Sequence, residues 1–227
     1  EARAVINKVL AVNGATPLPA QTHLVPARVP AGAATSIMAP MLRRATIGLM
    51  LVWFLVSLSY YGVFVWVPGQ RATEGFGFVR GYGFLVILAL AQVPGYALAA
   101  WGVEAVGRRA TLAGFLVLSA AGCGLFAFAT SGAVVAGALI LMSFALLGTW
   151  GALYAFTPEL YPTHLRGTGM GTASAMARLG GILAPSLLAV VFAQGFGLAI
   201  GSFALLLLLA AAALMLVRTE TRAQAIG

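Results

Sequence analysis

Six apolar runs, each about twenty residues or longer, constrain this chain more than any other feature of its sequence. A helix rises 1.5 Å per residue, so each run is long enough to cross about 30 Å of hydrocarbon. Lipid offers no partners to backbone polar groups, and such runs therefore cross a membrane as helices. The sequence predicts an all-α membrane protein with six transmembrane helices. The runs occupy approximately residues 45–67, 81–101, 110–130, 133–156, 168–193 and 197–217.

The composition agrees with a chain whose main solvent is lipid. Hydrophobic residues make up 61% of the sequence and charged residues 8%, whereas soluble domains are about half apolar and a quarter charged. The net charge of +8 comes from cations that stand singly or in pairs between the apolar runs. This dispersal argues against a nucleic-acid surface and favours topology signals. The single cysteine, Cys123, lies inside a run and has no partner for an intrachain disulfide.

The cations fall into two unequal groups when the six runs are threaded back and forth across a membrane. Lys and Arg are enriched on cytoplasmic loops, so the larger group marks the cytoplasmic side. Of the 13 cations, ten fall on one side, Arg71 and Arg80 on the other, and Arg178 within a run. Both ends of the chain are therefore predicted to be cytoplasmic. The ten are Arg3, Lys8, Arg28, Arg43, Arg44, Arg108, Arg109, Arg166, Arg218 and Arg222.

Residues 1–40 differ from the rest of the chain. They contain no charged segment followed by an apolar one, so they are not a signal peptide, and we expect further sequence before Glu1. Helix formers up to Val12 predict a short surface helix, and Asn13-Gly14 and five prolines predict a coil after it. The predicted organisation is a cytoplasmic segment at 1–40, a six-helix bundle at 41–218 and a cytoplasmic tail at 219–227.

Two of the predicted cytoplasmic loops carry recognisable motifs. Ala100 to Arg109, between the second and third runs, is similar to the pattern G-x-x-x-D-x-x-G-R-R, with Ala100 in place of the first glycine and Glu104 in place of the aspartate. Glu159 to Gly169, between the fourth and fifth runs, is similar to E-L-Y-P-T-x-x-R-x-x-G. With these motifs the chain resembles the major facilitator superfamily, in its branch of organic ion transporters and metabolite:proton symporters, which is similar to the sugar porters.

The resemblance implies that residues 41–218 form the C-terminal half of a twelve-helix fold whose two six-helix halves are related by an axis along the membrane normal. It further implies an N-terminal half as partner, with residues 1–40 as the end of the linker between the halves. Secondary transport by alternating access, coupled to protons, in a bacterial inner membrane is the implied activity. The alternative to proton coupling is a uniporter or exchanger, because the runs contain no carboxylate or histidine. The loop charges would form a network that stabilises one state, although ordinary surface ion pairs are the alternative. The network residues are Glu104, Arg108, Arg109, Glu159 and Arg166.

Several polar residues lie inside the first, second and fourth runs. Polar groups in hydrocarbon are costly unless they face protein or water, so we expect them to border the solute pathway. The alternative for the aromatic ones is a belt at the membrane interface. Gln92 is the one amide well inside a run. The candidates for solute binding are Ser57, Tyr60, Tyr61, Gln92, Trp150 and Tyr154.

Arg178 is the one charge well inside a run. It follows Arg166 by twelve residues, hence by about 18 Å along a helix, which is near the middle of the membrane. The chain has no Asp, and none of its glutamates lies inside a run. A solute carboxylate could supply the missing negative charge, and the resemblance also implies an organic anion, such as an aromatic acid, where this position is basic. An acid of the other half or backbone carbonyls are alternative partners.

Three other functions compete with transport of an organic anion. An intramembrane enzyme would need a nucleophile with a base, paired aspartates or a metal cluster, and the runs contain none of these. We therefore predict no catalytic residue, metal or cofactor. A receptor-like relative that does not transport is disfavoured by Arg178 and by the polar first run. A sugar or polyol porter would call for more amide and acidic groups than Gln92 alone.

Overall fold

The computed structural model describes residues 2–19, 21–22, 34–66 and 77–221. Three cations of the orientation argument, Arg28, Arg71 and Arg222, lie outside the described residues. Helices are the only regular elements in the described part of the chain, which contains no strand. It divides into two units, Glu1–Ala33 and Ala34–Gly227.

The first unit contains one helix, α1, at Ala2–Val12. None of its residues is buried, and the chain turns away at Gly14, whose φ of 67° favours glycine. The backbone N–H of Leu18 donates to Asn7 Oδ1 at 2.7 Å, which folds the following segment back along the helix. A short, exposed helix ending at Asn13-Gly14 is the arrangement that the sequence predicts for these residues.

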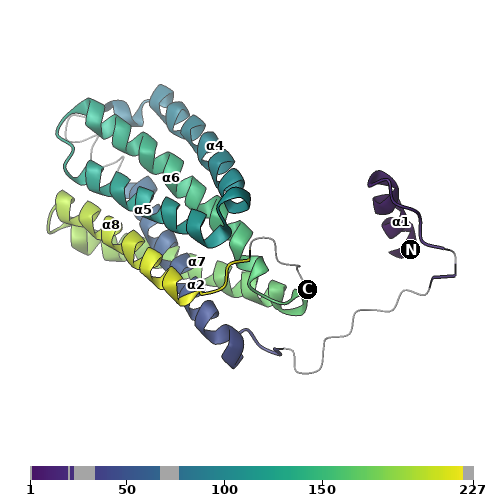
Figure 1. Cartoon of the computed structure of the whole chain (residues 1–227). Coiled ribbons are helices and arrows are strands. Elements are labelled where there is room, and N and C mark those ends of the chain that lie inside the picture. The colour runs from purple at the N-terminus through teal and green to yellow at the C-terminus, as the bar shows by residue number, and fades with distance from the viewer. Residues whose placement is uncertain (1, 20, 23–33, 67–76, 222–227) are drawn as a thin grey trace. The chain divides into compact units, whose positions relative to one another are not determined.

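The second unit is a bundle of six long helices (Figure 1), and this confirms the predicted fold class. All six are long and apolar enough to cross a membrane. Short π-helical and 3₁₀ turns extend or precede some of them, at Gly62–Trp66, Gly77–Arg80, Thr163–Leu165 and Leu214–Leu216. The six helices are α2 (Pro40–Tyr61), α4 (Tyr82–Ala105), α5 (Arg108–Ala127), α6 (Gly132–Glu159), α7 (Arg166–Phe192) and α8 (Phe196–Ala213).

The helices extend beyond the apolar runs at the end where the loop motifs lie. α2 begins at Pro40, because proline at the first helical position gives up no backbone hydrogen bond and has a suitable φ. α4 continues to Ala105 and α6 to Glu159, so both helices carry a glutamate in their last turns. Helical hydrogen bonding does not require apolar side chains, so hydropathy alone places the ends of α4 and α6 too early in the sequence.

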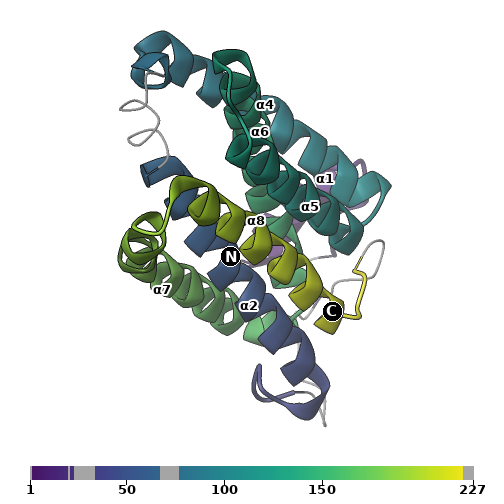
Figure 2. The same cartoon turned by 90° about the vertical axis from the view of Figure 1, so that its left-hand side faces the viewer.

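The six helices form two layers (Figure 2). α6 lies between α4 and α5, while α2 lies between α7 and α8, and the α5–α8 contact joins the layers. Large side chains fill the space between them, among them Trp53, Phe156 and Phe203. Two glycines allow close approach: a Cβ on Gly95 would clash with the Phe144 carbonyl oxygen of α6, and one on Gly180 would lie 2.6 Å from the Phe54 carbonyl oxygen of α2.

Candidate functional site

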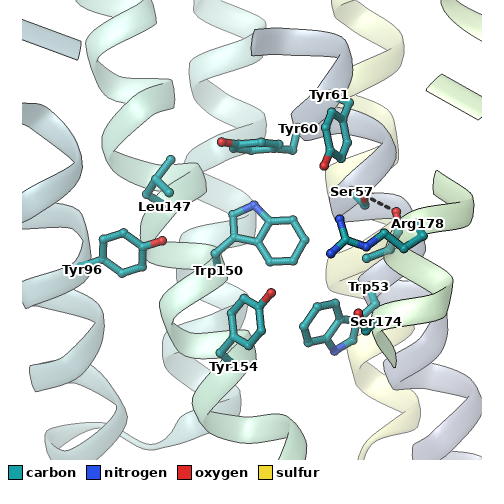
Figure 3. A pocket seen from close by; sticks show the side chains of 11 residues that line it. Trp53, Ser57, Tyr60, Tyr61, Tyr96, Leu147, Trp150, Tyr154, Ser174 and Arg178 are labelled. Atoms are coloured by element: carbon teal, nitrogen blue, oxygen red, sulfur yellow. Dashed lines mark hydrogen bonds between the residues drawn. The ribbon is translucent and has the colours of Figure 1, made fainter. Parts of the chain in front are cut away.

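A cavity of about 240 Å³ lies between helices α2, α4, α6 and α7 (Figure 3). Six of the seven residues predicted to bind solute line it, all except Gln92. The lining residues are Trp53, Ser57, Tyr60 and Tyr61 of α2, Tyr96 of α4, Leu147, Trp150 and Tyr154 of α6, and Ser174, Ala177 and Arg178 of α7.

Helical spacing brings these residues to one place. Side chains four positions apart share a face of a helix, and the cavity uses this interval on three helices. The pairs are Trp53 with Ser57, Trp150 with Tyr154, and Ser174 with Arg178.

The aromatic rings of the cavity pack edge to face. The ring of Trp53 lies 5.4 Å from that of Trp150 at 65°, and 5.0 Å from that of Tyr154 at 88°. Tyr60 lies 5.9 Å from Trp150 at 86°. Such contacts are favourable beyond their buried area and hold the rings in defined orientations. Trp53 is buried whereas Tyr154 is 56% exposed, so the cluster runs from the bundle core to an open face.

Arg178 supplies the only charge among the described residues that line the cavity. Figure 3 shows its guanidinium directed into the cavity toward the ring of Trp150. Within the part of the chain that the structure describes, this side chain makes no hydrogen bond or ion pair. Its neighbour Ala177 is tied to α2, because the Ser57 hydroxyl donates to the Ala177 carbonyl at 2.6 Å. The arrangement offers a planar cation, open for a bidentate partner, beside a set of aromatic faces.

Gln92 lies apart from this cavity, in contrast to the expectation that it would contact the solute. Its Nε2 donates to Ser143 Oγ of α6 at 3.3 Å, and that hydroxyl donates to the Leu88 carbonyl of α4 at 2.8 Å. In hydrocarbon a lone amide costs free energy, so it finds a partner on the neighbouring helix. Gln92 therefore holds α4 against α6.

Three polar or aromatic residues that line the cavity were not among the residues predicted from the sequence. Trp53 stands four residues before Ser57, and Ser174 four before Arg178, so the i, i+4 rule applied to the predicted residues would have found both. Tyr96 follows Gly95, whose close approach to α6 brings the tyrosine to the cavity wall. The predicted residue Gln92 stands four positions before Tyr96 on α4, so the same rule would have found this tyrosine too.

A cluster of charges, Glu104, Arg108 and Glu159, lies where α4 and α6 end and α5 begins. Arg108 donates to both carboxylate oxygens of Glu159, from Nε at 2.9 Å and from Nη2 at 3.1 Å. It also donates to Glu104 at 2.9 Å and to the Val103 carbonyl at 2.8 Å. The side chains of Arg108 and Glu159 are 11% and 16% exposed, whereas that of Glu104 is 72% exposed. The bidentate pair between α5 and α6 is therefore the strong one.

The two other predicted members of the network are placed differently. The Arg109 side chain makes no hydrogen bond or ion pair within the described residues. Arg166 donates from Nε to the Tyr161 carbonyl at 3.2 Å, at the start of α7. The charge cluster thus centres on the first arginine of the Arg108-Arg109 pair.

Glu220 and Thr221 join the charge cluster, and the sequence analysis missed both. The Glu220 carboxylate accepts the backbone N–H groups of Arg108 at 2.9 Å and Arg109 at 3.1 Å, which caps the first turn of α5. The Thr221 hydroxyl donates to Glu159. Gly107 leaves room for this cap, because a Cβ there would lie 2.8 Å from Glu220 Oε2. The conformation of Gly107, with φ of 122°, also favours glycine.

Residues 9–185, more than half of the chain, match the Major Facilitator Superfamily. The chain belongs to this superfamily. The predicted family is confirmed. It is a family of transporters and not of enzymes, and the six candidate spans agree with a multi-pass membrane protein.

Bacterial and animal members of the superfamily are similar to this chain. The niacin transporter NiaP of Acinetobacter baylyi is 41% identical over 181 residues, which are 79% of this chain and 41% of that protein. A Bacillus subtilis protein named as a candidate niacin/nicotinamide transporter, NiaP, is 40% identical over 79% of this chain and 45% of its own length. Solute carrier family 22 member 15 of Xenopus tropicalis is 36% identical over 67% of this chain and 29% of its own length. The chain spans less than half the length of these relatives.

Proposed function

We propose that this chain is the C-terminal six-helix half of a secondary transporter for a small aromatic carboxylate, with nicotinate as the first solute to test. The N-terminal half would close the open side of the cavity. The solute would bind between the halves, with its carboxylate on Arg178 and its ring among the aromatic side chains.

The observation that carries this proposal is the position of Arg178. A guanidinium in a membrane span is costly unless it meets a partner, and the described residues around this one provide neither an acid nor a carbonyl acceptor. A carboxylate matches its two parallel donors. The rings of Trp150 and Tyr154 line the same cavity as the guanidinium, where they can pack against a flat ring that carries the carboxylate.

The names of the two bacterial relatives support an aromatic acid. Niacin is a pyridine ring with one carboxylate, which are the two features that the cavity can contact. Nicotinamide has the same ring and no negative charge, so it separates the role of Arg178 from that of the rings. A sugar porter is less well supported, because Gln92, the amide that would bind hydroxyl groups, already bonds to Ser143.

The charge cluster has a role in alternating access in this proposal. The Arg108–Glu159 pair joins α5 to α6, and Thr221 and Glu220 tie the end of the chain to the same place. Such a cluster would stabilise one conformation and separate in the other. The cluster would face the cytoplasm of a bacterium, as the distribution of cations predicts.

Proton coupling would depend on the other half. The interiors of the spans in this chain contain no Asp, Glu or His, since Glu104 and Glu159 stand in the last turns of their helices. A group that carries a proton near mid-membrane would therefore come from the N-terminal half.

Uptake by the full-length protein in liposomes tests the proposal. Labelled nicotinate, benzoate and nicotinamide would be compared for the wild type, Arg178→Ala and Arg178→Lys, with Arg44→Ala as a control on an exposed arginine of α2. We expect uptake of both carboxylates to fall at least tenfold with Arg178→Ala, because a hydrogen bond to a charged group contributes about 1.5–3 kcal/mol. Undiminished carboxylate uptake, or a preference for nicotinamide in the wild type, would refute it.

A further inference from the structure

A second cavity, of about 280 Å³, lies between α5 and α8 near the charge cluster. Small and flexible apolar side chains form most of its wall, and Met215 is 67% exposed at its edge. As candidate spans, α5 begins and α8 ends here, so in a membrane the cavity would open where hydrocarbon meets the headgroup region. The lining residues are Arg109, Ala110, Ala113, Ala211, Leu214, Met215 and Glu220.

The charges of this second cavity are not balanced against each other. Glu220 is occupied by the N-terminus of α5, because its two oxygens accept the backbone N–H groups of Arg108 and Arg109. Arg109 offers five donors in its side chain, and none of them has an acceptor among the described residues. The rim therefore presents a guanidinium that the charge cluster does not use.

We propose that this cavity binds an anionic phospholipid. The phosphate would accept hydrogen bonds from the Arg109 guanidinium, which suits a phosphate group geometrically. An acyl chain would then run along Ala110, Ala113 and Ala211 toward the membrane centre. Ala113 lies one turn further along α5 than Arg109, about 6 Å deeper, so the apolar wall begins below the charge.

An anionic headgroup suits this site better than a zwitterionic one. Arg109 provides a positive charge, and a choline or ethanolamine headgroup would bring its own cation to the same rim. A soluble phosphate ester would satisfy Arg109 but would leave the apolar wall uncovered. The combination of one cation with an apolar wall on the membrane face favours the lipid.

Native mass spectrometry of the full-length protein in detergent can measure this binding directly. Phosphatidylglycerol and phosphatidylcholine would be titrated in turn against the wild type and three variants. Arg109→Gln removes the guanidinium, and Ala211→Phe fills the apolar part. Arg44→Gln is the control, because Arg44 is an exposed arginine one turn from Gly48, which packs against Leu216 at the same end of the bundle.

We expect the Kd of the tightest phosphatidylglycerol site to rise about tenfold with Arg109→Gln, in line with the loss of a charge-assisted hydrogen bond. Ala211→Phe should weaken the same site, while Arg44→Gln should leave it unchanged. A thermal melt of each variant checks folding. If Ala211→Phe does not fold, the Kd of Arg109→Gln alone tests the proposal. Neither the binding nor its loss depends on which solute the protein carries.

Three outcomes would overturn the proposal. Equal weakening by Arg109→Gln and Arg44→Gln would mean general attraction of lipid to a cationic surface. Competition by glycerol 3-phosphate at the same concentration would mean a site for a soluble phosphate. A protein dimer that requires Arg109 would mean that a second copy, rather than a lipid, covers the cavity.

Discussion

The indole Nε1 of Trp53 donates a hydrogen bond of 2.9 Å to the hydroxyl oxygen of Thr157, between α2 and α6. Thr157 is fully buried, and its own proton goes to the Leu153 carbonyl at 2.6 Å. The direction of both hydrogen bonds is therefore fixed. The bond between Trp53 and Thr157 orients the buried indole ring of the cavity. Thr157 stands two positions before Glu159 of the charge cluster.

Thr157→Val removes the acceptor of the indole N–H while keeping the shape of the side chain. A buried donor without a partner costs about 1–3 kcal/mol, so the variant should unfold at a lower temperature and bind solute less tightly. Thr157→Ser keeps the hydroxyl and should restore solute affinity toward that of the wild type. The uptake KM and the thermal midpoint of the full-length protein measure both effects, and equal KM values for the two variants would contradict this role.

Glu159→Gln and Glu104→Gln separate the two ion pairs of Arg108. Glu159 is largely buried and accepts two hydrogen bonds from the guanidinium, so its substitution should destabilise the protein by about 1.5–3 kcal/mol. Glu104 is 72% exposed, and its pair should contribute less than about 1 kcal/mol. Denaturation of the two variants side by side tests this order. A larger effect of Glu104→Gln would show that the exposed pair dominates the cluster.

Gly180→Ala should push α7 away from α2. The added Cβ would lie 2.6 Å from the Phe54 carbonyl oxygen and 3.1 Å from the Leu58 nitrogen, which are backbone atoms of α2. Overpacking of this kind costs about 1–3 kcal/mol. Gly171→Ala, on the same helix, meets nothing within 4 Å among the described atoms and should be neutral or stabilising by about 0.5–1 kcal/mol. Thermal stability of the pair provides the comparison, and equal shifts would contradict close packing at Gly180.

Tyr154→Leu should weaken solute binding while Tyr154→Phe should preserve most of it. Tyr154 lines the cavity, its ring packs against Trp53 at 5.0 Å, and the residue is more than half exposed. Loss of one aromatic contact is worth about 0.5–1.5 kcal/mol, which corresponds to a KM about two- to tenfold higher. A large effect of Tyr154→Phe instead would assign the contact to the hydroxyl rather than to the ring.

The six helices and most of the cavity could be predicted from the sequence, because both depend on local periodicity. A span needs about twenty apolar residues, and a polar group within it has to face protein or water. Ser57, Trp150 and Arg178 follow from this rule. The ends of α4 and α6 could not be predicted from this rule, because hydrogen bonds continue a helix past the last apolar residue.

Contacts between distant segments were beyond the reach of the sequence. Gln92 satisfies the same rule as Trp150, but it bonds to Ser143, which lies 51 residues away on α6. Only the packing of α4 on α6 determines that Gln92 contacts Ser143 and not the cavity. Arg108 and Arg109 are adjacent and chemically identical. Which of them meets Glu159 depends on the rotation of α5 about its axis, and the motif does not specify that rotation.

The cap that Glu220 places on α5 has a consequence for the order of biosynthesis. Glu220 follows Arg109 by 111 residues, so the first turn of α5 has no acceptor from Glu220 while α6, α7 and α8 are still being synthesised. At about 5–20 residues per second, this interval lasts roughly 5–20 s. During that time the N–H groups of Arg108 and Arg109 depend on water, and α5 receives its cap from Glu220 only after α8 has been made.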